Sequence, residues 1–494
     1  MSTIPPEELQ KGLKLVIKDG VASQAMTTLS AGTFLVAFAL ELGASNLTIG
    51  ILAGLTPLIQ LIQLPSIYLV ERFRNRRKIV VISSLIGRLF LLLIASIPFL
   101  FNPSFGLFFL ILFLAIHSAF AAITSCSWNS WMRDFLPQEG LGTFSSKKMI
   151  WSTILGILLS LLGAYFIDQS NLLFPGNPTW VYSVLFVMAF LSGMLGSYYM
   201  SRIPEPPMVP SGLNLIKLIS APFKDTNFRN LIKFLGTWNF AVNLAAPFFT
   251  VYMLQRLDIP MAMVIILVTI SQAANLMLLK TWGRISDQYS NKTILAICGP
   301  LFIFTILLWT FTTFPDKHFL TIPMLFVIHI FMGASTSGIS IASGNIGLKL
   351  APHGGGLAYL AVISLINSIA AGLAPILGGL FADYFLKKKL SIVINWSNAE
   401  QSFTIPTIDI QQWDFFFLIS FGIGLYSIQR LFFVIEKGEI SEKIVLSQIY
   451  SEVKGQMKNL TSVGGMRAII AFPFGVIRNM PILKKTFKKR SLKD

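Results

Sequence analysis

The chain has 494 residues, a formal net charge of +17 and only 12% charged residues. A soluble domain carries about 25% charged residues, so this composition excludes an ordinary soluble protein. The excess of positive charge would suit a nucleic-acid binder. The bases, however, lie mainly in short gaps between apolar runs and in a C-terminal tail, so we expect no nucleic-acid partner.

Long apolar runs recur along the chain as far as residue 435. A run of about 20 apolar residues is long enough to cross a membrane as a helix. These runs are continuous rather than alternating, which favours helices over a β-barrel. The sequence therefore predicts an all-α integral membrane protein with twelve transmembrane helices, near residues 21–41, 48–70, 79–100, 105–131, 149–167, 180–201, 230–254, 260–280, 293–313, 321–347, 356–385 and 413–435.

Lysine and arginine gather on one side of these predicted spans. The segments on the side of the two termini hold 32 of the 39 bases, whereas the loops on the other side hold 5. Bases near membrane ends concentrate on the cytoplasmic side. We therefore expect a multi-pass protein of the cell membrane with both termini in the cytoplasm.

The two halves of the chain repeat one another. Four pairs of residues occupy equivalent places in the order of helices at an offset of 215 or 216 residues: Glu71 and Asp287, Asn129 and Asn345, Pro137 and Pro352, and Asp168 and Asp383. A unit of helices used twice, with a site between the copies, is an architecture of secondary transporters. The pattern predicts six-helix bundles at 1–201 and 230–436, a cytoplasmic linker at 202–229 and a basic amphipathic tail at 437–494.

A charged segment, ERFRNRRK at residues 71–78, separates the second and third predicted spans, and GRISDQYSNK at 283–292 is its counterpart in the second half. These segments resemble the signature loop of the major facilitator superfamily, Gly-x-x-x-Asp-(Arg/x)-x-Gly-Arg-(Arg/Lys). Glu71 stands for the Asp in the first copy, while the second copy is matched by Gly283, Arg284, Asp287 and Lys292. The resemblance covers about 21–436 and implies two pseudo-symmetric six-helix bundles.

The resemblance also implies a role for the acid of each loop. In such transporters the acid contacts the start of a helix in the other half while the cytoplasmic side is closed. A carboxylate at a helix N-terminus is stabilised by about 0.3–1 kcal/mol. We expect Glu71 to pair with Arg133 or with the segment at 354–358, and Asp287 to act near residues 133–142; the alternative is that the bases only orient the helices. The gating candidates are Glu71, Arg72, Arg133, Gly283, Arg284 and Asp287.

Ionisable side chains are costly at membrane depth and are usually functional there. We expect no acid deep in a span, because those nearest to a span fall at its ends: Asp19, Glu41, Asp168 and Asp383. The ionisable groups deep within spans are Arg88, His117 and His329. Each histidine can carry a coupling proton, or it can be a neutral partner of a backbone carbonyl. Arg88 can bind an anionic group of a substrate, although we favour a side chain that snorkels to the interface or pairs within the N-terminal half.

Neutral polar side chains at membrane depth complete the expected site. Amides with indoles nearby suit a neutral polar ring or an amphipathic organic molecule. Each amide alone can equally be an interhelical hydrogen bond. We favour Asn239 and Asn243, which are one turn apart on the seventh span. The substrate-binding candidates are Gln24, Thr28, Gln60, His117, Asn129, Asn239, Asn243, Asn275, His329 and Asn367.

These features together predict an alternating-access secondary transporter for a small organic solute, with proton coupling as one option. The alternative is a transporter-like membrane sensor or a lipid-handling protein. The sequence has no ATP-binding loop and no spacing typical of a catalytic triad, so we expect neither an enzyme nor a cofactor. We expect a monomer whose basic tail binds anionic lipid headgroups.

Overall fold

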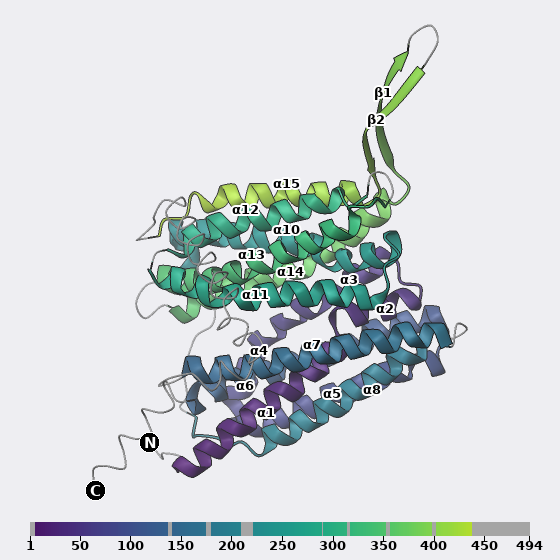
Figure 1. Cartoon of the computed structure of the whole chain (residues 1–494). Coiled ribbons are helices and arrows are strands. Elements are labelled where there is room, and N and C mark those ends of the chain that lie inside the picture. The colour runs from purple at the N-terminus through teal and green to yellow at the C-terminus, as the bar shows by residue number, and fades with distance from the viewer. Residues whose placement is uncertain are drawn as a thin grey trace, which may run out of the picture.

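We describe the protein from a computed structural model, in which the described residues are 5–136, 141–173, 179–208, 221–288, 290–313, 317–351, 356–397 and 402–436. The predicted tail at 437–494 and the middle of the linker, residues 209–220, lie outside the described residues. Figure 1 shows two helical bundles side by side, one built from each half of the chain.

The N-terminal bundle has one short 3-10 helix among its α-helices. Within it, α5 packs against α6 and α8, and α8 packs against α1. The elements are α1 (Pro6–Ser30), α2 (Gly32–Glu41), α3 (Asn46–Ile59), η1 (Gln60–Ile62), α4 (Gln63–Phe73), α5 (Arg76–Leu100), α6 (Pro103–Phe135), α7 (Leu141–Leu173) and α8 (Thr179–Ser201).

The C-terminal bundle follows the linker and contains a two-stranded hairpin before its last helix. A π-turn, η3, extends its first long helix. The elements are η2 (Ala221–Lys224), α10 (Thr226–Val251), η3 (Tyr252–Arg256), α11 (Met261–Gln288), α12 (Asn291–Thr310), α13 (Thr321–Leu350), α14 (Gly356–Phe385), β1 (Lys389–Ser397), β2 (Ser402–Gln411) and α15 (Trp413–Leu431).

Ten helices among the described residues are long and apolar enough to cross a membrane. Two of these ten are continuous pairs, α1 with α2 and α3 with α4. Neither α10 nor α15 is among the ten. Both nevertheless pack inside the C-terminal bundle, where α15 contacts α10 and α12. With α10 and α15, the described part of each half has six long elements, so the predicted membrane protein of two six-helix bundles is confirmed.

The first helix begins earlier than predicted, and this changes the place of one acid. We expected the first span to start at residue 21 with Asp19 at its end, but α1 starts at Pro6 and Asp19 lies near its middle. Lys11, Lys14 and Lys18 are exposed while Asp19 is buried. The basic residues occupy the outer face of a helix, and only its inner face packs against the bundle. The expectation that Asp19 lies at the end of a helix was therefore wrong.

The region between α14 and α15, which separates the last two predicted spans, forms two strands that the sequence analysis did not predict. Strands β1 and β2 pair antiparallel from Lys389 with Gln411 to Ser397 with Ser402, with an irregularity after Ile392. Figure 1 shows this hairpin projecting away from the bundles, beyond the end of the molecule opposite to the start of α1. We call the two ends of the molecule the hairpin end and the α1 end.

The two bundles approach closely where α3 meets α14. A side chain at Gly50 would collide with the backbone carbonyl of Pro375, and one at Gly54 would collide with that of Gly372. Gly50 and Gly54 are four residues apart and therefore lie on one face of α3. This spacing of small residues allows helix backbones to touch in membranes. The halves are thus held together at this seam by direct backbone packing.

Candidate substrate site and gating loops

The N-terminal bundle contains a cavity of about 620 Å³, which we call the N-terminal cavity. Five helices contribute to it: α1, α5, α6, α7 and α8. Its lining includes polar side chains as well as apolar ones. Four ionisable side chains reach it, namely Asp19, Arg88, His117 and Lys148. Protein cavities of about 300–1,000 Å³ accommodate small organic molecules.

Arg88 and Asp19 supply opposite charges to this cavity, and each side chain is only 5% exposed. The Arg88 guanidinium donates through Nη1 to the carbonyl of Gly193 and to Oγ of Ser197, both on α8. A side chain at Gly196 would meet both Oδ1 of Asp19 and Nη1 of Arg88. The missing side chain at Gly196 therefore leaves the space that these two charged groups share. Pairing of Arg88 within the N-terminal half, one of the two options that the sequence favoured, is what the structure shows.

Two predicted site residues, Gln24 and His117, line the N-terminal cavity. Nδ1 of His117 lies 2.8 Å from the carbonyl of Gly87, and Nε2 of Gln24 donates to Oγ1 of Thr28 at 3.2 Å. The histidine thus has the backbone-carbonyl partner that we considered, and it also faces the cavity.

Three more predicted residues meet in a second cavity of about 490 Å³, which we call the inter-bundle cavity. Gln60 reaches it from η1 of the N-terminal half, and Asn239 and Asn367 reach it from α10 and α14 of the C-terminal half. Nδ2 of Asn239 donates to Oδ1 of Asn367 at 3.0 Å. Uncharged amides from both halves therefore line one space.

The remaining predicted site residues line neither of these two cavities. His329 is buried, its Nδ1 lies 2.8 Å from the carbonyl of Leu325, and its ring packs edge-on against Trp309. The other four occupy separate places on their helices: Thr28 is half-buried on α1, Asn129 is exposed, Asn243 donates to the carbonyl of Asn239, and Asn275 is half-buried on α11.

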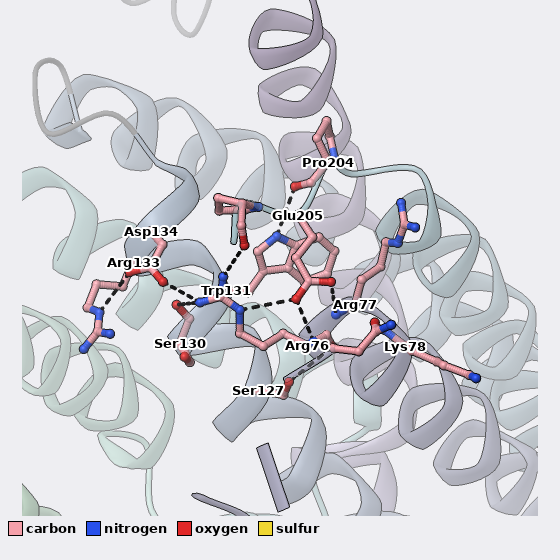
Figure 2. A network of polar contacts seen from close by, with 12 residues as sticks. Arg76, Arg77, Lys78, Ser127, Ser130, Trp131, Arg133, Asp134, Pro204 and Glu205 are labelled. Carbon is pink, nitrogen blue, oxygen red and sulfur yellow. Dashed lines mark hydrogen bonds and ion pairs between the residues drawn. The ribbon is translucent and has the colours of Figure 1, made fainter. Parts of the chain in front are cut away.

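The charged segment at 71–78 is organised around one buried base, Arg76 (Figure 2). Its guanidinium forms an ion pair with Asp134 at the end of α6 and contacts Glu205 at 3.4 Å. It also donates to the carbonyls of Ser130 and Pro206, at 3.0 and 2.7 Å. Arg76 therefore ties the start of α5 to α6 and to the segment after α8.

Glu205 adds a second tie at the same place. Its carboxylate accepts hydrogen bonds from the backbone amides of Arg76 at 2.7 Å and Arg77 at 3.1 Å. The first amides of a helix have no partner inside the helix, and a negative charge beside them is favourable. Glu436 does the same for α12, accepting from the amide of Lys292 at 2.7 Å. Each half thus has an acid after its last helix that caps one of its own helices.

The predicted gating residues lie near the ends of α4, α6 and α11. Nε of Arg133 lies 3.3 Å from Oδ1 of the neighbouring Asp134, and Arg72 is exposed. Gly283 is half-buried and Arg284 is exposed, near the end of α11. The side chain of Asp287 and those of 354–358 lie outside the described residues, so pairing by Glu71 and Asp287 stays a prediction.

Sequence reasoning missed Asp19 and Lys148 as cavity residues. The signal for Asp19 was a polar stripe with helical spacing, formed by Asp19, Ser23 and Thr27. All three line the cavity, and Oγ of Ser23 donates to Oδ1 of Asp19 at 3.2 Å. Lys148 lies within a stretch that reads as a basic membrane flank, and no pattern separates it from the neighbouring Lys147.

Comparison with known proteins assigns the family. A family model described as Major Facilitator Superfamily matches residues 20–340 and residues 231–485. No curated protein matches the chain.

Three solved structures share the fold. A variant of the nucleoside transporter NupG superposes with a TM-score of 0.66 at 16% identity, covering 86% of this chain and 100% of that chain. A POT family transporter in complex with a thioalcohol-conjugated peptide gives 0.61 at 12% identity, covering 86% and 98%. A bacterial homologue of the iron transporter ferroportin gives 0.61 at 10% identity, covering 88% and 100%. The family match spans nearly the whole chain, and with the two six-helix bundles it shows that this protein belongs to the Major Facilitator Superfamily and is a multi-pass secondary transporter rather than an enzyme.

Proposed function

We propose that this transporter carries a small polar organic solute across a cell membrane, and that the solute binds in the N-terminal cavity. The observation that carries the proposal is the presence of two buried, oppositely charged side chains, Arg88 and Asp19, on the wall of one cavity. Charges inside a membrane protein are expensive, and they usually mark a substrate or ion path. The distribution of bases supports a cytoplasmic location for the α1 end.

The free hydrogen-bonding capacity of Arg88 supports a solute with an anionic group. Among the described residues its guanidinium bonds only through Nη1. Nε and Nη2 remain to receive a carboxylate or a phosphate, which guanidinium groups bind through two parallel hydrogen bonds. Lys148 adds a second positive charge to the same cavity. Asp19 supplies an acceptor for a hydroxyl group on the same solute.

Proton coupling through Asp19 and His117 is the second part of the proposal. Both side chains line the cavity, and Asp19 shares the space beside Gly196 with Arg88. A proton on Asp19 would remove the charge that competes with an anionic solute for Arg88. Proton binding and solute binding would then favour each other, which is the requirement for coupled movement.

Thermal stabilisation of the purified protein tests solute binding. Candidate solutes include organic acids, amino acids, peptides, sugars and nucleosides, the last because of the structural likeness to a nucleoside transporter. A solute at 100 times its dissociation constant stabilises the folded state by about 2.7 kcal/mol. We expect a stabilising anionic solute whose effect is lost in Arg88→Gln and kept in the control Arg77→Gln, since Arg77 is exposed. Stabilisation that survives Arg88→Gln would contradict the proposed site.

Flux measurements in proteoliposomes test the coupling. A solute gradient should move protons with the solute in the native protein. In Asp19→Asn we expect solute exchange without net proton movement, and Glu41→Gln, an exposed acid on α2, serves as the control. Proton movement that persists in the double variant Asp19→Asn with His117→Gln would show that neither group carries the proton.

A further inference from the structure

Asp383 bridges the two halves of the molecule at the hairpin end. It lies near the end of α14, in the C-terminal half, and it accepts three hydrogen bonds from the start of α3 in the N-terminal half. The donors are the backbone amides of Asn46 at 3.3 Å and Leu47 at 3.0 Å, and Nδ2 of Asn46 at 2.9 Å. The carboxylate therefore caps the first turn of a helix in the opposite bundle.

Asp168 makes the reciprocal contact. It lies near the end of α7, in the N-terminal half, and its two oxygens accept from the backbone amides of Met261 at 3.2 Å and Ala262 at 2.8 Å. These amides open α11 in the C-terminal half. The residue before α11 is Pro260, which has no side-chain acceptor of its own. Asp168 thus takes the place of the missing cap of α11 from across the interface.

The internal repeat copies both partners of this contact. The two acids are 215 residues apart, and so are the corresponding donors: Asp168 and Asp383, Asn46 and Met261, Leu47 and Ala262. A chance surface contact would not recur with both partners at one offset. The repeated contact therefore belongs to the architecture of the two halves and not to one local loop.

We propose that Asp168 and Asp383 are a symmetric pair of gate residues that hold the hairpin end closed during the transport cycle. The first amides of α3 and α11 have no partner inside their own helices, and a carboxylate beside them is favoured by hydrogen bonding and by the helix dipole. Each contact requires the two bundles to be together at this end. It stabilises the closed state and is absent from a state in which this end is open, so it shifts the equilibrium between them.

The close contact of Gly50 and Gly54 of α3 with the backbone of α14, which we call the glycine seam, involves the same two helices as the Asp383 contact. A side chain at Gly379, one turn before Asp383, would collide with the carbonyl of Asn46. Asp383 and the backbone that it caps are therefore fixed in register by packing. Opening of the hairpin end must separate this seam and both carboxylates together, so the two gates should act as one.

Distances between spin labels across the hairpin end test the gate. Labels at the exposed residues Glu41 and Lys387 report on the two halves in the full chain in liposomes, after both native cysteines, Cys126 and Cys298, are replaced by alanine. We expect Asp168→Asn and Asp383→Asn each to lower the closed-to-open ratio about tenfold, and the double variant to lower it further. The ratio is measured without solute, so the result does not depend on the proposed substrate.

Two further variants keep the test decisive. Asp258→Asn removes an acid that is exposed at the same end, in a left-handed backbone conformation that Asn also adopts, and should leave the distances unchanged. Asn46→Pro removes two of the three donors to Asp383 at the first helical position, where proline is well tolerated, and should open the end as Asp383→Asn does. Native distances in a folded Asp168→Asn, Asp383→Asn double variant, or equal opening in Asp258→Asn, would overturn the proposal.

Discussion

The two ends of the molecule use the same contact, an acid at a helix N-terminus, in opposite ways. At the α1 end, Glu205 and Glu436 cap α5 and α12, and each acid directly follows the last helix of the half that it caps. At the hairpin end, Asp168 and Asp383 cap α11 and α3, which belong to the other half. Both ends use the same type of hydrogen bond. At the α1 end the capped helix belongs to the same half as the acid, whereas at the hairpin end it belongs to the other half.

This difference separates contacts that stabilise the fold of one bundle from contacts that shift the equilibrium between conformational states. A contact inside one bundle persists while the bundles move as rigid bodies, so it contributes to the folding of that bundle in every state. A contact between bundles exists in one state only, so its free energy appears in the equilibrium between states. Substitutions at the α1 end should therefore change unfolding, and substitutions at the hairpin end should change conformation.

The largest effect on stability should follow from removing the buried base at the α1 end. Arg76→Met leaves Glu205 and Asp134 without their shared cation, and loss of one member of a buried ion pair costs about 3–5 kcal/mol. We expect a loss near the lower limit because Asp134 is 31% exposed. Thermal unfolding in detergent measures it. The control Arg77→Met should change stability by less than about 0.5 kcal/mol, and equal losses in both variants would refute the role of Arg76.

A side chain introduced into the glycine seam should test the same distinction at the hairpin end. Gly54→Leu would collide with the carbonyl of Gly372, and overpacking costs about 1–3 kcal/mol. The collision exists only when the hairpin end is closed, so we expect label distances there to shift toward the open state. Gly422→Leu, at a position of α15 with open space, is the matched control. A closed hairpin end in folded Gly54→Leu would contradict this account.

Neutralising the acids of the α1 end should give a smaller effect of a different kind. We expect Glu205→Gln and Glu436→Gln each to lower unfolding stability by about 1–2 kcal/mol, because charged caps become neutral ones. The label distances at the hairpin end should not change. If either variant opened the hairpin end, the division between structural and gating caps would fail.

The main features of the fold were predictable because they depend on composition. Continuous apolar runs indicated the spans, and the offset between Asp168 and Asp383 indicated the duplication. The amides Gln60, Asn239 and Asn367 were chosen separately as polar groups at membrane depth, and they line one cavity. Their part in binding stays a prediction.

Other features depend on contacts between segments far apart in the chain. Asp19 was misplaced because the lysines around it made its segment resemble a cytoplasmic extension before the first span. These lysines in fact lie on the outer face of α1. The hairpin of β1 and β2 was missed because a loop between spans has no burial pattern to read. The role of Asp383 depends on the amides of Asn46 and Leu47, more than 330 residues away, which no local pattern can show.

The smallest predicted effect concerns the inter-bundle cavity, which lies along the interface between the two ends. Asn239→Ala removes the hydrogen bond to Asn367, and such bonds in membrane proteins contribute about 0.6 kcal/mol. We therefore expect unfolding stability and label distances close to those of the native protein. Asn129→Ala, at an exposed position, is the control. If the solute also reaches this cavity, Asn239→Ala will weaken solute stabilisation while Asn129→Ala will not; an equal response in both variants would confine the solute to the N-terminal cavity.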